Sequence, residues 1–152
     1  MKVLVAISDR DQGLALAHWI SANHWPKETK LRLLNLIPWH APDRELIYSN
    51  TLAKYIEDQY QGAKELLKSA TAIITKAHPE IEVDEEILHG HPAECILSTA
   101  AGWQAEMIIV GTHNRKGWDL LLNGSVSAAI ASHAACNVLV VRTIPVTARI
   151  LA

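Results

Sequence analysis

The hydrophobic positions along the chain fall into five short runs separated by longer segments with a helical period. Four of the runs are four to seven residues long and mostly apolar, and the run from Ile81 to Ile87 alternates apolar with acidic residues; both patterns are typical of β-strands. The runs are Val3 to Ile7, Leu31 to Ile37, Ile81 to Ile87, Met107 to Val110 and Val138 to Val141. The pattern therefore predicts five strands.

Between these runs, apolar residues recur at steps of three and four, the spacing that draws one stripe along an α-helix. The longest stripe predicts a helix whose buried face holds Leu52, Ile56, Tyr60, Ala63, Leu67, Ala70, Ile74 and Ala77. A shorter helix is predicted around Leu16, Trp19 and Ile20.

Two more helices are predicted in the second half of the chain. One has His91 as its cap, Pro92 at its first position and Glu94 in its first turn, a pattern that favours a helix start. The other begins near Gly124 and Ser125, and its expected buried face holds Val126, Ala129, Ile130 and His133.

Strands that alternate with helices indicate a parallel sheet covered on both faces, because parallel neighbours need crossover helices. We expect one α/β domain over residues 1–152, with about four helices. The segment from Pro38 to Asn50 carries prolines and polar residues and is predicted to be a loop. Its two rings, Trp39 and Tyr48, either close over a ligand or pack on the surface.

Composition narrows the range of partners and compartments. The chain has 152 residues, of which 49% are hydrophobic, and a formal charge of -2, so there is no general basic field for nucleic acid or an anionic membrane. Cys95 and Cys136 show no paired spacing, which favours a reducing compartment. No apolar stretch has the length of a membrane span or a signal sequence. We expect a cytoplasmic protein.

The segment "GTHNRKGWDLLLNGSVS" (residues 111–127) joins a predicted strand to a predicted helix and has features of a phosphate site. Such a site needs inward backbone N–H groups, close approach without a Cβ atom and a helix N-terminus. Gly111, Gly124 and Ser125 meet these demands, and Arg115 and Lys116 add positive charge. Ser125 would equally serve as a helix cap.

The segments "VLVAIS", "HGHPAECIL", "MIIVGTHN" and "NGSVSAAIASHAACNVLVVR" together resemble the universal stress protein family, in order and over nearly the whole chain. The family's nucleotide signature, G-x2-G-x9-G-[S/T], would fall on Gly111, position 114, Gly124 and Ser125. Position 114 is Asn, and Ser8 stands where members that bind ATP typically carry Asp. Asn tolerates the left-handed backbone that Gly adopts, but it brings a side chain into the space that a phosphate needs. The substitution therefore weakens the predicted phosphate site without abolishing it.

The resemblance implies a fold, a ligand and an assembly. The fold is the adenine-nucleotide alpha-hydrolase-like sandwich, with strand order 3-2-1-4-5, and its crevice lies where strands 1 and 4 diverge. The ligand is ATP or AMP, with Mg²⁺ possible beside ATP. The implied binding residues are Ser8, Asp9, Leu36, Ile37, Gly111, His113, Asn114, Arg115, Gly124, Ser125, Val126 and Ser127, with Leu36 and Ile37 acting through main chain.

The two edge strands of the expected sheet have opposite character. One edge strand carries charges that discourage pairing with another chain, at Glu82, Asp84 and Glu86. The other edge strand is apolar and carries no such charge; it is formed by Val138, Leu139, Val140 and Val141. Either a second copy of the chain or the C-terminal segment "IPVTARILA" is expected to cover it. The homodimer that the resemblance implies is therefore physically reasonable.

Other groups fit structural roles better. His89 and His91 are too few for a metal site, which needs three or four ligands, and we expect no metal. His133 and Cys136 are expected to pack in the interior. No nucleophile-and-base arrangement is evident, so a binding protein is favoured over an enzyme, for which only His113, Arg115 and Lys116 lie near the phosphates.

Two binding interpretations remain open. In the first, a homodimeric stress-response protein binds ATP or AMP in the crevice. In the second, the same fold holds no nucleotide and acts through its dimer surface and protein partners, as the departures at Ser8 and Asn114 would favour.

Overall fold

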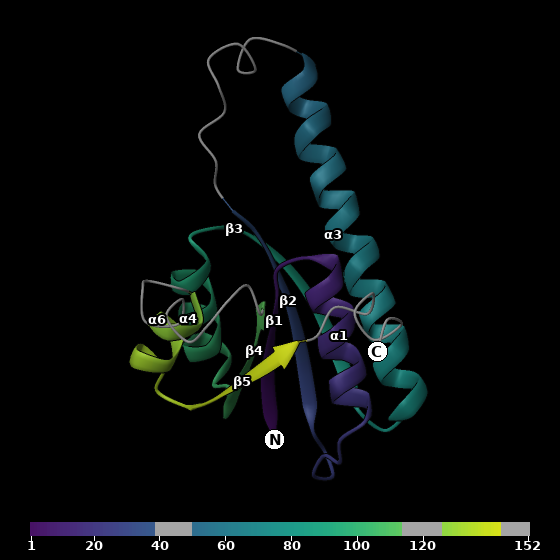
Figure 1. The fold of residues 1–152 in the computed structure, drawn as a ribbon, viewed down its shortest axis with the longest axis vertical. Coiled ribbons are helices and arrows are strands. Elements are labelled where there is room, and N and C mark those ends of the chain that lie inside the picture. The colour runs from purple at the N-terminus through teal and green to yellow at the C-terminus, as the bar shows by residue number, and fades with distance from the viewer. Residues whose placement is uncertain (39–49, 114–125, 144–152) are drawn as a thin grey trace.

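A computed structural model describes residues 1–38, 50–113 and 126–143 and shows a five-stranded parallel sheet in the order β3-β2-β1-β4-β5 (Figure 1). This order confirms the expected 3-2-1-4-5 topology. The elements are β1 (Lys2–Ile7), α1 (Arg10–Ser21), β2 (Lys30–Pro38), α3 (Asn50–Ala77), β3 (Glu82–Gly90), α4 (Pro92–Trp103), β4 (Met107–His113), α6 (Val126–His133) and β5 (Asn137–Thr143).

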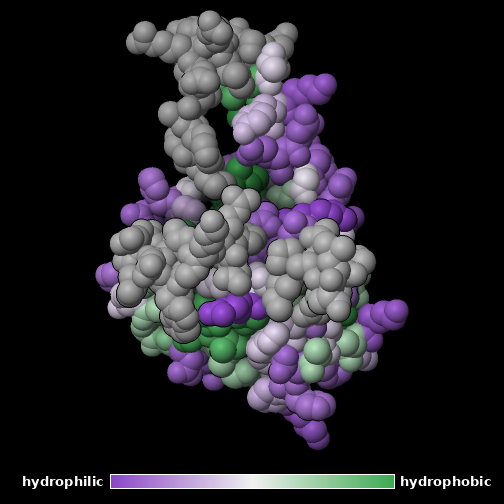
Figure 2. Space-filling model, viewed as in Figure 1, coloured by the Kyte–Doolittle hydropathy of each residue, from purple (hydrophilic) through white to green (hydrophobic). Residues whose placement is uncertain are grey.

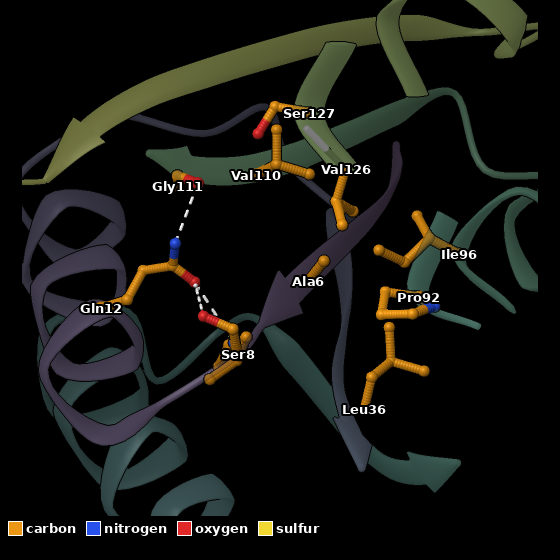
Figure 3. Close-up of a pocket in the computed structure, with 11 residues that line it drawn as sticks. Ala6, Ser8, Gln12, Leu36, Pro92, Ile96, Val110, Gly111, Val126 and Ser127 are labelled. Atoms are coloured by element: carbon orange, nitrogen blue, oxygen red, sulfur yellow. Dashed lines mark hydrogen bonds between the residues drawn. The ribbon is translucent and has the colours of Figure 1, made fainter. Parts of the chain in front are cut away.

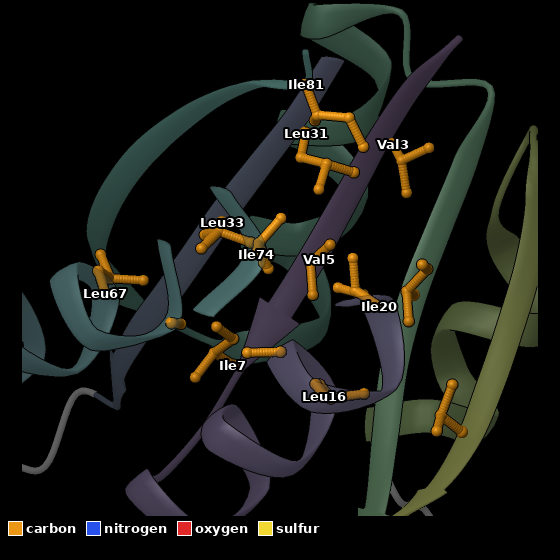
Figure 4. Close-up of a cluster of buried hydrophobic side chains, with 14 of the residues drawn as sticks. Val3, Val5, Ile7, Leu16, Ile20, Leu31, Leu33, Leu67, Ile74 and Ile81 are labelled. Carbon is orange, nitrogen blue, oxygen red and sulfur yellow. The ribbon is translucent and has the colours of Figure 1, made fainter. Parts of the chain in front are cut away.

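The four helices of the described residues cover the two faces of the sheet in pairs. α1 and α3 pack on one face and α4 and α6 on the other (Figure 1). Because successive strand residues point to opposite faces, β1 sends Val3, Val5 and Ile7 toward α1 and α3, and Leu4 and Ala6 toward α4 and α6. The first of these cores, shown in Figure 4, also holds Leu16, Ile20, Leu31, Leu33, Leu67, Ile74 and Ile81.

The strands are longer than the apolar runs that predict them, except at the start of β3, which begins at Glu82. In particular, β4 continues three residues beyond its run to His113 and pairs in register with β5, Gly111 opposite Val141 and His113 opposite Thr143. Gly111 and His113 were expected in a loop, and this prediction is wrong. The hydrophobic pattern does not predict this continuation, because Thr112 and Thr143 are polar. Thr143 is nevertheless buried, and its hydroxyl donates to the Thr112 carbonyl at 3.0 Å.

Helix α3 is much longer than the face that it covers. Its 28 residues correspond to about 42 Å at the usual rise per residue. The predicted stripe is buried at Ala63, Leu67, Ala70 and Ile74, but Ile56 and Tyr60 are 48% and 41% exposed, and Ala77 is exposed too. The prediction of one continuous buried face is wrong because the N-terminal half of α3 extends beyond the sheet (Figure 1). The outer side of this half is hydrophilic (Figure 2).

The two helices on the other face begin near where the sequence predicts. His91 is the N-cap residue of α4 and Pro92 its first residue, but the His91 side chain makes no cap hydrogen bond. In α6, Ile130 is buried and Ala129 half-buried as expected. Val126 and His133 are exposed, which contradicts the expected face: His133 lies in the last turn, where its Nδ1 is 2.9 Å from the Ala129 carbonyl.

The acidic residues of the β3 edge are paired with cations of β2. Lys30 Nζ lies 2.8 Å from Glu82, and Arg32 lies 3.4 Å from Asp84 and 3.5 Å from Glu86. The hydrogen bond and the charge of Glu82 raise the pKa of Lys30. These charges protect the β3 edge from pairing with another chain, as the sequence predicts.

Three stretches fall outside the described residues: 39–49, 114–125 and 144–152. Of the predicted loop, only the ends are therefore seen, with Pro38 closing β2 and Asn50 opening α3. The predictions that concern Trp39, Tyr48 and the C-terminal segment fall in these stretches.

Candidate nucleotide crevice

A crevice opens where the central strand β1 ends earlier than its neighbours. β1 pairs with β2 as far as Ile7 and Asn35 and with β4 as far as Ala6 and Val110. Beyond these points β2 continues to Pro38 beside β3, and β4 continues to His113 beside β5. The chain winds outward in opposite directions from β1 and β4, so the crevice lies at the switch point where ligands bind in open α/β sheets.

A cavity of about 210 Å³ occupies this crevice (Figure 3). Leu36, Pro92 and Ile96 lie on one side of it, while Ser8, Gln12 and Gly111 lie on the opposite side. The remaining lining residues are Ala6, Ile7, Val110, Val126 and Ser127. The cavity thus has a broad apolar wall and a small polar end, the usual combination for a small-molecule site. A whole-ligand site commonly measures about 300 Å³ or more, so this space suits a base with part of a sugar.

Two buried side-chain amides complete the hydrogen bonding where β1 stops. Asn35, which is 4% exposed, donates from Nδ2 to the Ile7 carbonyl at 3.0 Å. Gln12, which is 6% exposed, donates from Nε2 to the Gly111 carbonyl at 2.8 Å. β1 ends before it can pair with Gly111 of β4, so the Gln12 amide donates to the Gly111 carbonyl in its place. A buried carbonyl without a hydrogen-bond partner would cost free energy.

The position of Gln12 explains why residue 111 is glycine. A Cβ atom on residue 111 would lie 2.8 Å from Cγ and 2.9 Å from Cδ of Gln12, closer than carbon atoms normally approach. The sequence suggests instead that Gly111 lets a phosphate approach the backbone. In the structure, the Gln12 side chain occupies this space. Gly111, the first glycine of the signature, therefore allows Gln12 to pack against the backbone.

The sequence analysis did not assign six of the lining residues: the apolar Ala6, Ile7, Pro92, Ile96 and Val110, and the polar Gln12. Gln12 is the one of these with a side chain that forms hydrogen bonds. It lies four and eight residues before Leu16 and Ile20, which are both fully buried on the same face of α1. A polar residue at the start of an apolar helical face, just after a predicted strand, was the signal that could have identified it.

The two candidate residues after β1 have different roles. Ser8 lines the cavity, and its hydroxyl donates to Gln12 Oε1 at 2.6 Å. Asp9 is the N-cap of α1, where its carboxylate accepts from the Gln12 backbone N–H at 3.0 Å. Its other oxygen lies 3.2 Å from the Ser8 hydroxyl. Asp9 is not among the lining residues of the cavity, so its carboxylate serves the helix start.

Of the candidates on β2 and α6, Leu36, Val126 and Ser127 line the cavity, and Ile37 does not. Leu36 and Ile37 are each 7% exposed, and they lie beyond the level at which β1 pairs with β2. Leu36 lines the cavity, as do Val126 and Ser127 at the described start of α6. Ser127 is buried, whereas Val126 is 39% exposed and faces the cavity instead of the core.

The other candidates lie at or beyond the end of β4. His113 is the last residue of that strand, three residues after Val110 in the cavity wall. The candidates Asn114, Arg115, Gly124 and Ser125, together with Lys116, fall outside the described residues. The structure thus brings together Ser8, Leu36, Gly111, Val126 and Ser127 from the predicted set and adds Gln12.

No lining residue of the cavity, as far as the chain is described, has an ionisable side chain. Within the same ranges, no three His, Cys, Asp or Glu side chains lie close enough to hold a metal ion. Cys136 is half-buried, and desolvation raises the pKa of its thiol, which keeps it in the less reactive protonated form. The chemistry offered by these residues is binding by shape and neutral hydrogen bonds.

None of the helices seen in residues 1–38, 50–113 and 126–143 is long and apolar enough to cross a membrane.

Comparison with known proteins places these features in a family. Residues 1–142 match the model of the universal stress protein family. Universal stress protein A homolog 2 of Coxiella burnetii is 33% identical over 148 residues, covering 93% of this chain and 94% of that relative. A universal stress protein solved in complex with cAMP aligns over 95% of this chain and 98% of its own, with a TM-score of 0.65 and 19% identity. A family member from Arabidopsis thaliana with AMP bound aligns over 95% and 92%, with a TM-score of 0.61 and 17% identity.

Proposed function

Because this chain belongs to the universal stress protein family, we propose that it is a cytoplasmic, homodimeric stress-response protein that binds ATP or AMP in the crevice between β1 and β4. The observation that carries the proposal is the cavity itself: an apolar slot with one polar end, at the switch point of the sheet. The cAMP-bound and AMP-bound structures of the same fold support an adenine nucleotide as the ligand.

The residues present suit an adenosine moiety. A flat base would pack between Leu36, Pro92 and Ile96 on one side and Val110 on the other, where burial of its apolar faces is favourable. Leu36 and Ile37 lie past the last residue of β2 that pairs with β1, and in the proposal their main-chain groups bind the edge of the base. The sugar would then face Ser8 and Gln12.

The phosphates are assigned by the proposal to the start of α6 and the segment before it. Ser127 and Val126 line the cavity there, and the N-terminal end of a helix favours negative charge. Asn114, Arg115, Gly124 and Ser125 would complete this part, with His113 at its edge and Mg²⁺ accompanying ATP.

Calorimetric titration of nucleotide-stripped protein with AMP and with ATP, each with and without Mg²⁺, tests the proposal. We expect a dissociation constant in the micromolar range for at least one of the two, about -8 kcal/mol at 1 μM, and a higher melting temperature with ligand. No heat and no thermal stabilisation at millimolar ligand would contradict it.

A nucleotide-free interaction module is the second candidate, and one observation favours it. Gln12 already fills the space above Gly111 that a bound phosphate would need for close approach. In this case the protein would act through its dimer surface and protein partners, and the titration above would show no binding.

The proposed dimer forms through the edge strand β5. Among the described strands, β5 pairs only with β4, and its residues Val138 and Leu139 are half-buried while Val140 is 39% exposed. Figure 2 shows hydrophobic residues gathered in the region of β5 and α6. An apolar edge of this kind favours pairing or packing with a second copy.

Val140→Lys should convert the dimer to a monomer, because it places a charge in an apolar interface. Light scattering coupled to size exclusion, at one fixed protein concentration, measures the mass directly. Ile56→Lys is the matched control, since Ile56 is also an exposed apolar residue, at 48%, but lies on α3. A wild-type monomer, or a dimer lost with Ile56→Lys and kept with Val140→Lys, would contradict assembly through β5.

A further inference from the structure

The polar end of the cavity is a small hydrogen-bonded network centred on Gln12 (Figure 3). Gln12 Oε1 accepts from the Ser8 backbone N–H at 3.2 Å and from the Ser8 hydroxyl at 2.6 Å, and Nε2 donates to the Gly111 carbonyl at 2.8 Å. A backbone N–H can only donate and a carbonyl can only accept, so the two ends of the Gln12 amide cannot exchange places. The amide is held in one orientation.

Within residues 1–38, 50–113 and 126–143, the bonds of this network leave one N–H of Gln12 and the Ser8 oxygen available at the cavity wall. An amide nitrogen carries two hydrogens, and the Gly111 carbonyl uses one of them. The Ser8 hydroxyl gives its single hydrogen to Gln12 at 2.6 Å in preference to Asp9 at 3.2 Å, which leaves its oxygen as an acceptor. A neutral donor and a neutral acceptor therefore lie side by side at the cavity wall.

A hydroxyl group complements such a pair because it both donates and accepts. The carboxylate nearest to this point belongs to Asp9, which caps α1 and does not line the cavity. Turning it toward a ligand would give up the bond from the Gln12 backbone N–H, at a cost of about 1 kcal/mol or more. The sugar end of the site is thus formed by an amide and a hydroxyl.

We propose that Gln12 is the specificity-determining residue of the crevice: its amide N–H and the Ser8 oxygen together bind a ribose hydroxyl and so select ribonucleotides over deoxyribonucleotides. This inference rests on the proposed function, because it assumes that the base occupies the apolar wall. It adds a residue and a selectivity that the family resemblance does not assign.

The test compares AMP with 2′-deoxy-AMP and 3′-deoxy-AMP by calorimetry. Wild-type protein should bind AMP about tenfold more tightly than at least one deoxy analogue, which corresponds to about 1.4 kcal/mol. Gln12→Met, which keeps the length of the side chain without its hydrogen bonds, should weaken AMP about tenfold and leave that analogue nearly unchanged. Ser8→Ala, at an exposed residue, should reduce the same ratio without disturbing the fold.

Asn35→Ala is the matched control. Asn35 is a second buried amide at the end of β1, it makes one bond to a strand carbonyl, and it does not line the cavity. Its loss should lower stability and leave the ratio of AMP to deoxy-AMP affinity unchanged. A residue with only a structural role would behave like Asn35.

The outcomes separate the two proposals. If wild-type protein binds AMP and both deoxy analogues equally, or if Gln12→Met weakens all three ligands by the same factor, the role of Gln12 is overturned while nucleotide binding stands. If wild-type protein binds none of them, the proposed function fails and takes this inference with it.

Discussion

Replacing Ala6 with leucine should lower the affinity for AMP by at least about 100-fold, or about 2.7 kcal/mol. Ala6 lies in the middle of the cavity wall and is 8% exposed, with its side chain on the face covered by α4 and α6. The three added carbons would occupy the space between Leu36 and Val110 that the base needs. Titration calorimetry of the variant with AMP measures the loss.

The variant should keep its fold, because the added carbons enter a space of about 210 Å³ that is already apolar. Filling it should change the free energy of unfolding by less than about 1.5 kcal/mol. Ala101→Leu adds the same group at an exposed position of α4, and should leave both affinity and stability near wild type. Wild-type affinity in the Ala6→Leu variant would place the nucleotide outside this cavity.

Replacing Ile74 with alanine should lower the free energy of unfolding by about 2 to 5 kcal/mol. Ile74 is fully buried between α3 and the sheet, among Leu31, Leu33 and other members of the larger core (Figure 4). Truncation removes buried apolar surface and leaves a cavity that close-packed neighbours only partly fill.

The same substitution at Ile56, about five turns earlier in α3, should change the free energy of unfolding by less than about 0.5 kcal/mol, because that side chain is 48% exposed. Denaturant unfolding at one fixed protein concentration compares the two, since assembly makes stability depend on concentration. Equal losses at the two positions would show that the N-terminal half of α3 is covered in solution.

The sheet could be predicted from sequence because each strand carries a local signal. Short apolar runs such as Val3 to Ile7, separated by helical segments, are typical of the strands of a parallel sheet that is covered on both faces. The strand order came from the family resemblance, and the charged Glu82, Asp84 and Glu86 were consistent with it by marking an edge.

The predictions that failed concern where one element ends relative to another. The stripe of α3 is continuous in sequence, but Ile56 and Tyr60 are exposed because the sheet stops before the helix does. The continuation of β4 through Gly111 to His113 depends on pairing with β5, which the residues themselves do not show.

The candidate site divides in the same way. Ser8 lies just after strand 1, where the switch-point rule places a ligand, whereas Leu36 was implied only by the family resemblance. Gln12 could not be assigned from a signature, because its role depends on the distance from α1 to the Gly111 carbonyl, which tertiary packing sets.

The most direct test of the central claim is a measurement of nuclear Overhauser effects between AMP and protein with labelled methyl groups. If the base occupies the crevice, the adenine protons H2 and H8 should show contacts to methyl groups of Leu36, Ile96 and Val110. Contacts to other methyl groups alone, for instance Ile56 on α3, or saturating AMP without any contact to these three, would contradict the account.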